Sequence, residues 1–215
     1  MFDWVASRGG TPEDLIRGLF RQIVEGMRYM HSRGVCHADM SLENTLIDTD
    51  GRPYIMDFGM SLLMPIDTDG RRYMSVRDQR MAKGSYRTPE VFKNRAYDGV
   101  KVDVFGAGAM LFMILCGFPP FEVASRADRA FKKIVWEGDV NGLLRSYGVE
   151  EVSEAAAELL AWMMAYKPEN RPMPEEALAH RWFNPPPPPA AADVAEEAGV
   201  ADPDDPELAG GKAVA

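Results

Sequence analysis

Two short stretches decide the fold of this chain. Residues 37–44 read His-Ala-Asp-Met-Ser-Leu-Glu-Asn, and residues 57–59 read Asp-Phe-Gly. Between them, apolar arms at 46–47 and 54–56 flank an Asp-Gly pair at 50–51, and this pattern predicts a β-hairpin. The stretch therefore combines a polar loop, a tight turn and a second polar loop within 23 residues of chain.

The hairpin should bring three polar side chains together. Asn44 and Asp57 are equally far from the predicted turn, so folding the arms together should set them side by side at the open end. A carboxylate and an amide carbonyl are the oxygen ligands that Mg²⁺ prefers when phosphates complete its octahedron. Asp39, on the approaching loop, should face the same opening as a candidate acceptor for a proton leaving a substrate hydroxyl.

With these residues in view, the sequence resembles the eukaryotic protein kinases. The catalytic loop of that family reads H-R-D-x-x-x-x-N and its metal motif reads D-F-G. The resemblance implies that Asp39 is the catalytic base and that Asn44 and Asp57 hold Mg²⁺ together with ATP. The resemblance covers residues 2–183 in the family's order, and the joint spacing of its motifs is more specific than any one of them.

Further motifs downstream continue the resemblance. Residues 86–90 (Tyr-Arg-Thr-Pro-Glu) look like the end of an activation segment, residues 103–108 like the start of the family's central helix, and residues 180–183 like the end of the domain. The resemblance also implies a buried ion pair between Glu90 and Arg171. The expected fold is mainly α: a protein-kinase-like C-terminal lobe, with helices bundled around a buried central helix and a small β-hairpin at the catalytic loop.

Periodicity and capping residues locate the helices. An apolar stripe predicts a helix over 12–32, with Thr11 as its cap. The uncharged run 104–121 contains glycines and prolines, which favours a buried core helix over a membrane span, and Asp103 is its predicted cap. We predict further helices at 123–137, 153–166 (capped by Ser153) and 174–182, and a long loop over 60–88.

Composition separates a body from a tail. The chain has 215 residues and a formal net charge of −9, and residues 185–215 contain seven acids, one lysine and five consecutive prolines. We therefore predict a kinase lobe over 1–184 and a Pro/Ala-rich acidic disordered tail over 185–215. The proline run 185–189 fits a stiff spacer better than a ligand for proline-recognition domains, although both remain open.

The sequence departs from the family pattern in three places. Only 38 residues precede Asp39, and no G-x-G-x-x-G occurs, so the nucleotide-clamping N-terminal lobe is expected to be absent from this chain. Ala38 replaces the arginine that reads a phosphorylated activation segment. Ser41 replaces the catalytic-loop lysine, and we hypothesise that Lys83 supplies the lost positive charge; a solvated surface lysine is the equal alternative.

Two functions remain open on this reading. The first is a serine/threonine protein kinase, a transferase that moves the ATP γ-phosphoryl group to protein hydroxyls and is represented here by an inactive fragment. The second is a pseudokinase-like lobe that binds a protein partner without catalysis. Two cysteines and no signal peptide predict an intracellular, cytoplasmic protein. The sequence shows no dominant basic face and no membrane-spanning helix, so we expect neither nucleic acid nor a membrane as a partner. The expected partners are protein substrates.

Overall fold

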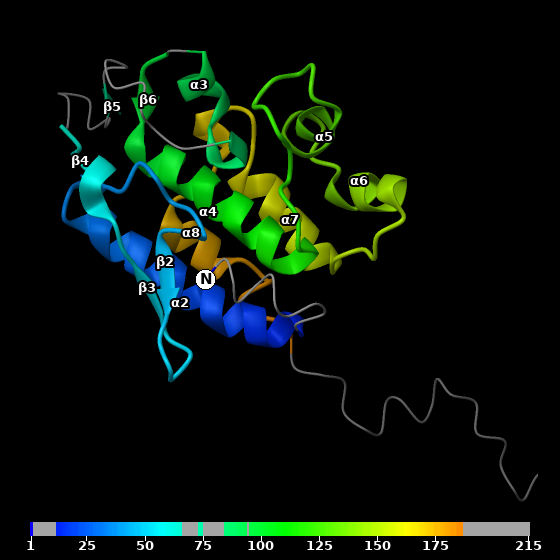
Figure 1. The fold of residues 1–215 in the computed structure, drawn as a ribbon, viewed down its shortest axis with the longest axis horizontal. Helices are drawn as coiled ribbons and strands as arrows, with labels where there is room; N and C mark the ends of the chain where they lie inside the picture. The colour runs from blue at the N-terminus through cyan, green and yellow to red at the C-terminus, as the bar shows by residue number, and fades with distance from the viewer. Residues whose placement is uncertain (2–11, 66–72, 75–83, 94, 187–215) are drawn as a thin grey trace, which may run out of the picture. The chain divides into compact units, whose positions relative to one another are not determined.

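The computed structural model describes residue 1 and residues 12–65, 73–74, 84–93 and 95–186 (Figure 1). The chain divides into two compact units, residues 1–184 and residues 185–215. The predicted disorder of the second unit stays a prediction, because residues 187–215 lie outside the described part. Thr11 and Lys83 lie outside it as well.

Helices make up most of the described part of residues 1–184, in line with the mainly α expectation. In chain order, the helical elements are α2 (Glu13–Ser32), η1 (Phe58–Met60), η2 (Gly84–Tyr86), α3 (Pro89–Phe92), α4 (Gly99–Cys116), α5 (Arg129–Phe131), the π-helical η3 (Lys132–Trp136), α6 (Val140–Tyr147), α7 (Glu154–Met163), η4 (Pro168–Asn170) and α8 (Pro174–Ala179).

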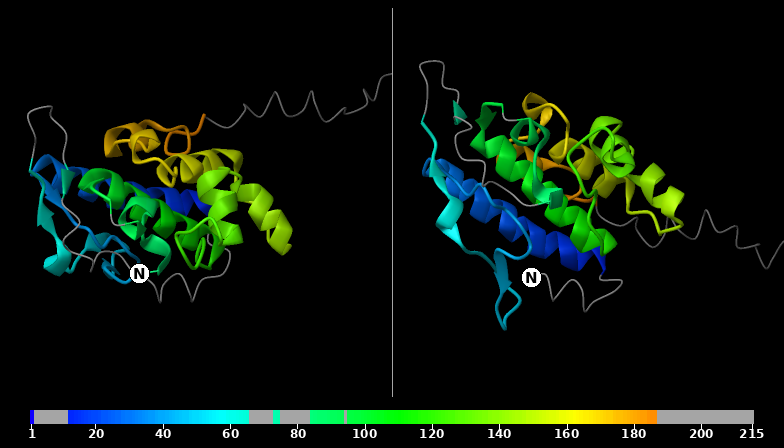
Figure 2. Two further views of the ribbon diagram at one scale, coloured as in Figure 1. Left: turned by 90° about the horizontal axis from the view of Figure 1, so that it is seen from above. Right: turned by 45° about the horizontal axis from the view of Figure 1, so that its top comes forward.

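The central helix of the lobe is α4. It packs against α2 and α7, and the right view of Figure 2 shows α2 and α4 running side by side. Fifteen of its eighteen residues are buried, so burial on all sides explains why its sequence after Asp103 is apolar throughout. Among the described residues, α4 is the one helix long and apolar enough to cross a membrane, and 83% of that stretch is buried inside the protein.

The cap of α4 differs from the prediction. The helix begins at Gly99, and the Asp98 carboxylate accepts a hydrogen bond from the Val100 backbone N–H at 2.9 Å. Asp103 lies inside the helix, where its carboxylate serves a different element. The helix ends at Cys116, and its C-cap, Gly117, has a φ of 81°, the left-handed conformation that glycine adopts without steric cost.

Glycine in α4 also allows close approach. A Cβ atom on Gly106 would lie 3.0 Å from the carbonyl oxygen of Met40 and 3.1 Å from its Cβ. These distances are tighter than ordinary van der Waals contact, so a side chain at residue 106 would require Met40 to move by a few tenths of an ångström. The glycine therefore lets Met40, in the loop over residues 37–44, pack directly on the central helix.

The strands form three antiparallel two-stranded sheets: β1 (Val35–Cys36) with β4 (Leu62–Leu63), β2 (Thr45–Ile47) with β3 (Pro53–Ile55), and β5 (Tyr73–Met74) with β6 (Tyr97–Asp98). The predicted β2–β3 hairpin is present. Its register pairs Thr45 with Ile55 and Leu46 with Tyr54, one residue away from the register that the Asp50-Gly51 turn predicted.

The turn explains this one-residue difference. The Asp48 carboxylate accepts hydrogen bonds from the backbone N–H groups of Asp50 and Arg52, both at 2.9 Å, and the Asp48 N–H bonds to the Arg52 carbonyl. Residues 49–51 therefore form a three-residue loop that ends in Gly51 at φ 80°. The prediction of a symmetric two-residue turn at 50–51 was therefore wrong.

Other helix boundaries also differ from the prediction. The predicted helix 123–137 begins only after Asp128, whose carboxylate caps Phe131 N–H at 2.9 Å. The sequence reading missed α6 altogether. Ser153 caps α7 as predicted, through its Oγ and the Ala156 N–H. No side-chain cap bond is present at Pro12, the N-cap of α2.

Glu13 connects both ends of the lobe. Its carboxylate accepts hydrogen bonds from Ser153 Oγ at 2.6 Å and from the indole N–H of Trp182 at 2.6 Å. Nearby, the ring of Phe20 on α2 stacks on Phe183 and meets Trp182 edge-on. The apolar face of the first described helix is thus covered by the last residues of the lobe.

Candidate active site

The carboxylate of Asp103 in α4 holds the backbone of the loop over residues 37–44. One carboxylate oxygen accepts the N–H of His37 at 2.8 Å and contacts His31 Nε2 at 2.8 Å, and the other accepts the N–H of Ala38 at 2.8 Å. Asp103 is 1% exposed. Asp103 therefore accepts two hydrogen bonds from the loop backbone and also contacts His31.

The anchored backbone is held in an uncommon conformation at Ala38. Its φ is 65°, the left-handed region that residues with a Cβ visit at a cost of roughly 1–2 kcal/mol. The bond to Asp103 fixes this conformation and turns the chain so that Asp39 emerges from the core. Asp39 is half-buried, in contrast to its buried neighbours on either side.

Asp39 and Asn44 come together as predicted. The Asn44 amide nitrogen donates to the Asp39 carboxylate at 2.8 Å and to the Asp39 backbone carbonyl at 2.9 Å. Because both amide hydrogens are engaged, the Asn44 carbonyl oxygen is oriented away from Asp39 and is available as a ligand. A cavity of about 180 Å³ opens here, lined by Asp39, Asn44 and three further residues, Ser41, Glu43 and Tyr86.

Ser41 lies inside the loop. Its Oγ accepts the N–H of Asn44 at 3.2 Å, its backbone carbonyl accepts Thr45 Oγ1 at 3.0 Å, and it is 6% exposed. Its hydroxyl therefore shapes the loop but brings no positive charge to the cavity. Lys83, the predicted replacement for that charge, lies outside the described residues.

Asp57 follows directly on the hairpin. Met56 N–H donates to the Asn44 carbonyl at 2.9 Å, so Met56 lies opposite Asn44, and Asp57 is one residue beyond that pair. Asp57 has φ 60° and is exposed, and its carboxylate accepts the N–H of Gly59 at 3.2 Å. Asp57 therefore follows the open end of the hairpin, but Met56 and not Asp57 lies opposite Asn44, which differs by one residue from the predicted pairing of Asn44 with Asp57. Asp57 is not among the residues lining the small cavity.

An aromatic contact fixes the position of the residue after Asp57. The ring of Phe58 meets that of His37 edge-on at 5.1 Å, and His37 Nε2 lies 2.9 Å from the Met56 carbonyl. His37 is fully buried. It joins the two polar loops structurally, through Phe58 and the Met56 carbonyl.

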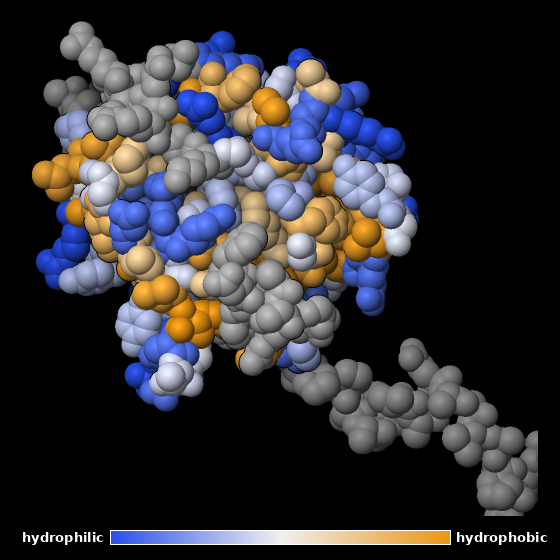
Figure 3. All heavy atoms as spheres, in the orientation of Figure 1, coloured by the Kyte–Doolittle hydropathy of each residue, from blue (hydrophilic) through white to orange (hydrophobic). Residues whose placement is uncertain are grey.

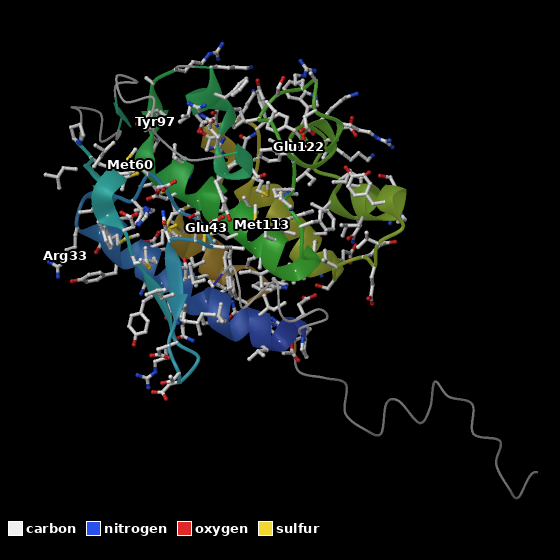
Figure 4. All side chains as sticks on the ribbon, in the orientation of Figure 1. Arg33, Glu43, Met60, Tyr97, Met113 and Glu122 are labelled. Atoms are coloured by element: carbon white, nitrogen blue, oxygen red, sulfur yellow. The ribbon has the colours of Figure 1, made fainter. Side chains whose placement is uncertain are left out.

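Tyr86 makes contacts with the loop over residues 37–44 that were not predicted from the sequence. Its hydroxyl accepts the N–H of Leu42 at 3.2 Å, donates to the Glu43 carboxylate at 3.1 Å, and lies 3.3 Å from the sulfur of Met113. Figure 4 shows Glu43 and Met113 next to each other on the loop and on α4. Burial, together with the charge of Glu43, raises the pKa of the Tyr86 hydroxyl, which stays protonated.

The expected pair of Glu90 and Arg171 is present and buried. The guanidinium donates to the two carboxylate oxygens at 2.7 and 2.9 Å, and its remaining N–H groups bond to the carbonyls of Ala165, Lys101 and Tyr166. All five guanidinium donors are thus satisfied. The pair ties the end of the segment after Tyr86 to the loop before α8.

One face of the hairpin presents apolar side chains beside Asn44. Leu46, Tyr54 and Met56 are 52%, 51% and 38% exposed, whereas Thr45 on the other face is buried. Figure 3 shows hydrophobic side chains gathered on the visible face next to this hairpin. The site therefore combines an apolar surface with a group of polar oxygens.

Comparisons with known proteins agree with this geometry. The protein kinase domain model matches residues 1–183. The chain belongs to the protein kinase family. CBL-interacting serine/threonine-protein kinase 15 of Arabidopsis thaliana is 33% identical over 82% of the chain and 39% of that protein. The carbon catabolite-derepressing protein kinase of Candida tropicalis is 34% identical over 85% of the chain and 27% of that protein.

A shorter match has a higher identity. CBL-interacting serine/threonine-protein kinase 16 of Arabidopsis thaliana is 40% identical over 56% of the chain and 26% of that protein. The chain thus spans about a quarter to two fifths of the length of these protein kinases. The family and the helical C-terminal lobe predicted from the sequence are confirmed.

The donor set fits a magnesium ion that is shared with phosphates. Asp57 offers an exposed carboxylate and Asn44 an amide oxygen whose NH₂ group is already bonded. Among the described residues, no group of three or more His, Cys, Asp and Glu side chains is arranged to hold a metal. One carboxylate and one amide are what Mg²⁺ uses when a nucleotide completes its shell, so the residues fit that ion.

Proposed function

We propose that this lobe belongs to a serine/threonine protein kinase, which transfers the ATP γ-phosphoryl group to a hydroxyl of a protein substrate. The observation that supports this proposal best is the pairing of Asp39 with Asn44 in a loop anchored to Asp103. A scaffold needs no half-buried carboxylate held in this way at the mouth of a cavity.

The chemistry assigned to this chain is proton transfer and positioning. The Asp39 carboxylate accepts the proton of the substrate hydroxyl while that oxygen forms its bond to the γ-phosphorus and the bond to the β,γ-bridging oxygen breaks. Asn44 restrains Asp39 through two hydrogen bonds, so little rotational freedom is lost when the substrate binds.

Asn44 and Asp57 are the proposed magnesium ligands. A Mg²⁺ ion bound there supplies positive charge against the phosphates. The exposed apolar face at Leu46 and Met56 would support the purine ring of ATP beside those ligands.

The serine/threonine assignment rests on relatives and on sequence. The relatives above are named as serine/threonine-protein kinases or as a protein kinase. Leu42-Glu43-Asn44 also resembles the serine/threonine branch more than the tyrosine branch. The protein substrates and the intracellular, cytoplasmic location belong to the same proposal.

One observation favours the second candidate, a non-catalytic lobe that binds a protein partner. Ser41 stands where the family has lysine, and its hydroxyl is engaged within the loop. If no other cation reaches the γ-phosphate, turnover would fall even with Asp39 in place. The negative charge on the γ-phosphoryl group would then lack a positive partner during its transfer.

The experiment has two stages. Sequencing the transcript upstream of Met1 should reveal, in frame, a glycine-rich loop and a V-A-x-K-like strand. The encoded protein is then assayed for phosphate transfer from ATP to casein. Asp39→Asn should lower kcat by roughly 10²–10⁴, the scale of general-base catalysis. Asp50→Asn is the matched control, because Asp50 is an exposed carboxylate at the hairpin tip.

The outcomes separate the two candidates. Transfer that depends on Asp39 and not on Asp50 supports the kinase. An open reading frame without the two upstream motifs, or normal turnover in Asp39→Asn, would overturn the enzyme proposal and leave the protein-binding lobe.

A further inference from the structure

A second polar cavity lies on another surface of the lobe. It has a volume of about 240 Å³ and lies between the residues that follow α3 and those around the start of η4. The side chains that give it its chemistry are Lys93, Arg95, Tyr166, Lys167 and Glu169. None of these residues belongs to the catalytic loop or to the proposed magnesium ligands.

Positive charge predominates in this cavity. Glu90 also lines it, but its carboxylate is neutralised by the bidentate bond to Arg171. Glu169 is then the remaining acid against three cations, which gives a local charge of about +2. Arg95 and Lys167 are exposed and form no ion pair with another described residue. A positive cavity on a chain with a net charge of −9 stands out as a candidate anion site.

Tyr166 adds an oriented donor. The Lys93 ammonium donates a hydrogen bond to the Tyr166 hydroxyl oxygen and lies 5.0 Å from the centre of its ring. Because the oxygen accepts this bond, the phenolic hydrogen is left to donate to another group. The ring itself is held edge-on against Trp136 at 4.6 Å. The cavity thus offers an O–H donor on a positioned ring together with three cationic side chains.

The charge favours a dianion. A phosphate monoester carries about −1.5 to −2 charges at neutral pH and three acceptor oxygens. Arg95 can hold two of these oxygens with its planar fork, while the two lysines act as point charges that tolerate imprecise geometry. A single carboxylate would neutralise only about half of the charge.

A neighbouring groove indicates that the phosphate is carried by a peptide. This groove has a volume of about 330 Å³, and Trp136, Gly138, Ala161 and Ala165 line it. It shares Tyr166 and Lys167 with the cationic cavity. An aromatic wall over small residues suits an apolar side chain, so a chain leaving the phosphate site would continue across Trp136.

We propose that this surface binds a phosphorylated serine or threonine within a peptide, with the phosphate between Lys93, Arg95 and Lys167 and the next residue against Trp136. The surface would recruit phosphoproteins, independently of whether the lobe is catalytic.

The test is a titration of the ¹⁵N-labelled 215-residue protein, followed by NMR. The probes are inorganic phosphate and acetyl-Ala-Ala-pSer-Pro-Ala-Ala-amide, with its unphosphorylated counterpart. We expect the phosphopeptide to bind at least about tenfold more tightly than inorganic phosphate, a difference of roughly 1.4 kcal/mol. The backbone amide signals that shift should come mainly from residues 90–95 and 166–169. The indole N–H signal of Trp136 should shift when the phosphopeptide is added but not when inorganic phosphate is added.

Variants decide which residues bind. Arg95→Gln and Lys167→Gln should each weaken peptide binding about 2–5-fold, the scale of an exposed charged contact. Tyr166→Phe keeps the ring against Trp136 and removes only the O–H, and it should weaken binding as well. Arg52→Gln, an exposed arginine at the hairpin, is the control and should change nothing. Unchanged amide dispersion shows that each variant is folded.

Three results would overturn the proposal. They are equal affinity for the two peptides, equal affinity for inorganic phosphate and the phosphopeptide, and an equal loss in Arg52→Gln and Arg95→Gln. None of them bears on the kinase proposal, because Asp39 and its partners take no part in the titration.

Discussion

Replacing Glu90 by glutamine should destabilise the lobe strongly. In the native pair, the Arg171 guanidinium is fully buried and Glu90 is 7% exposed. Glu90→Gln leaves one oxygen acceptor in place, turns an NH₂ group toward the guanidinium, and removes the compensating charge. Breaking a buried pair from one side costs about 3–5 kcal/mol. At roughly 2–4 °C per kcal/mol for a domain of this size, the midpoint of thermal unfolding should fall by about 6–20 °C.

A matched pair on the surface provides the control. Arg181 also donates two hydrogen bonds to one carboxylate, that of Glu158, through Nε at 2.8 Å and a terminal nitrogen at 2.7 Å, but both side chains are about half exposed. Glu158→Gln should therefore cost less than about 1 kcal/mol. The chemical change and the type of partner are the same in the two variants, so burial is the main difference between them.

Urea unfolding followed by circular dichroism measures both variants, and Arg171→Met completes a double-mutant cycle with Glu90→Gln. The double variant removes both charges of the pair and leaves neither one unpaired. Its loss in free energy of unfolding should therefore be smaller than the sum of the two single losses by at least about 2 kcal/mol. If Glu90→Gln does not fold, Glu90→Asp keeps the charge and gives a graded loss. Similar losses in Glu90→Gln and Glu158→Gln, or additivity within about 0.5 kcal/mol, would refute the reasoning.

Three further predictions concern single positions. Ala38→Gly should raise the free energy of unfolding by about 0.5–1 kcal/mol by relieving the left-handed strain, whereas Ala109→Gly inside α4 should lower it, both measured with urea. Burial raises the pKa of the Cys116 thiol from 9.0 to about 12, so iodoacetamide at pH 8.5 should alkylate the folded protein far more slowly than the urea-unfolded one. Because the folded pKa is the higher one, this thiol should cost stability as the pH rises from about 9 to 12, and an unchanged unfolding midpoint over that range would contradict the assignment. In the enzyme with its N-terminal lobe, Lys83→Met should lower kcat more than it raises KM for ATP, with partial rescue by Ser41→Lys; unchanged kcat would leave Lys83 as a surface lysine.

The sequence predicts those features of the site that depend on residues close to one another along the chain. Asp39 and Asn44 are five residues apart in one loop, and a single turn brings them into contact. The hairpin is equally local, but its register depends on whether Asp48 joins the turn. Asp-Gly at 50–51 favours a two-residue turn, and only the bonds from Asp50 and Arg52 to the Asp48 carboxylate select the longer one.

Contacts between distant segments could not be predicted in this way. Tyr86 reaches Glu43 across 43 residues, and His31 reaches Asp103 across 72. Local patterns carry no signal for such pairs. Helix α6 was missed for a related reason, because its eight residues are too few for a reliable period, and its buried Val140, Leu143 and Leu144 gain stability only from packing.

The hydrogen bond between Glu13 and Trp182 bears on how the lobe folds during synthesis. The two residues are 169 positions apart, so the ribosome must release nearly the whole lobe before they can meet. Until then, the buried face of α2, with Phe20 at its centre, has no Trp182 or Phe183 to cover it. A nascent chain that pauses early would expose this apolar helix to chaperones or to other chains. Removal of the last four residues of the lobe, 181–184, should therefore reduce soluble yield far more than removal of the tail that follows them.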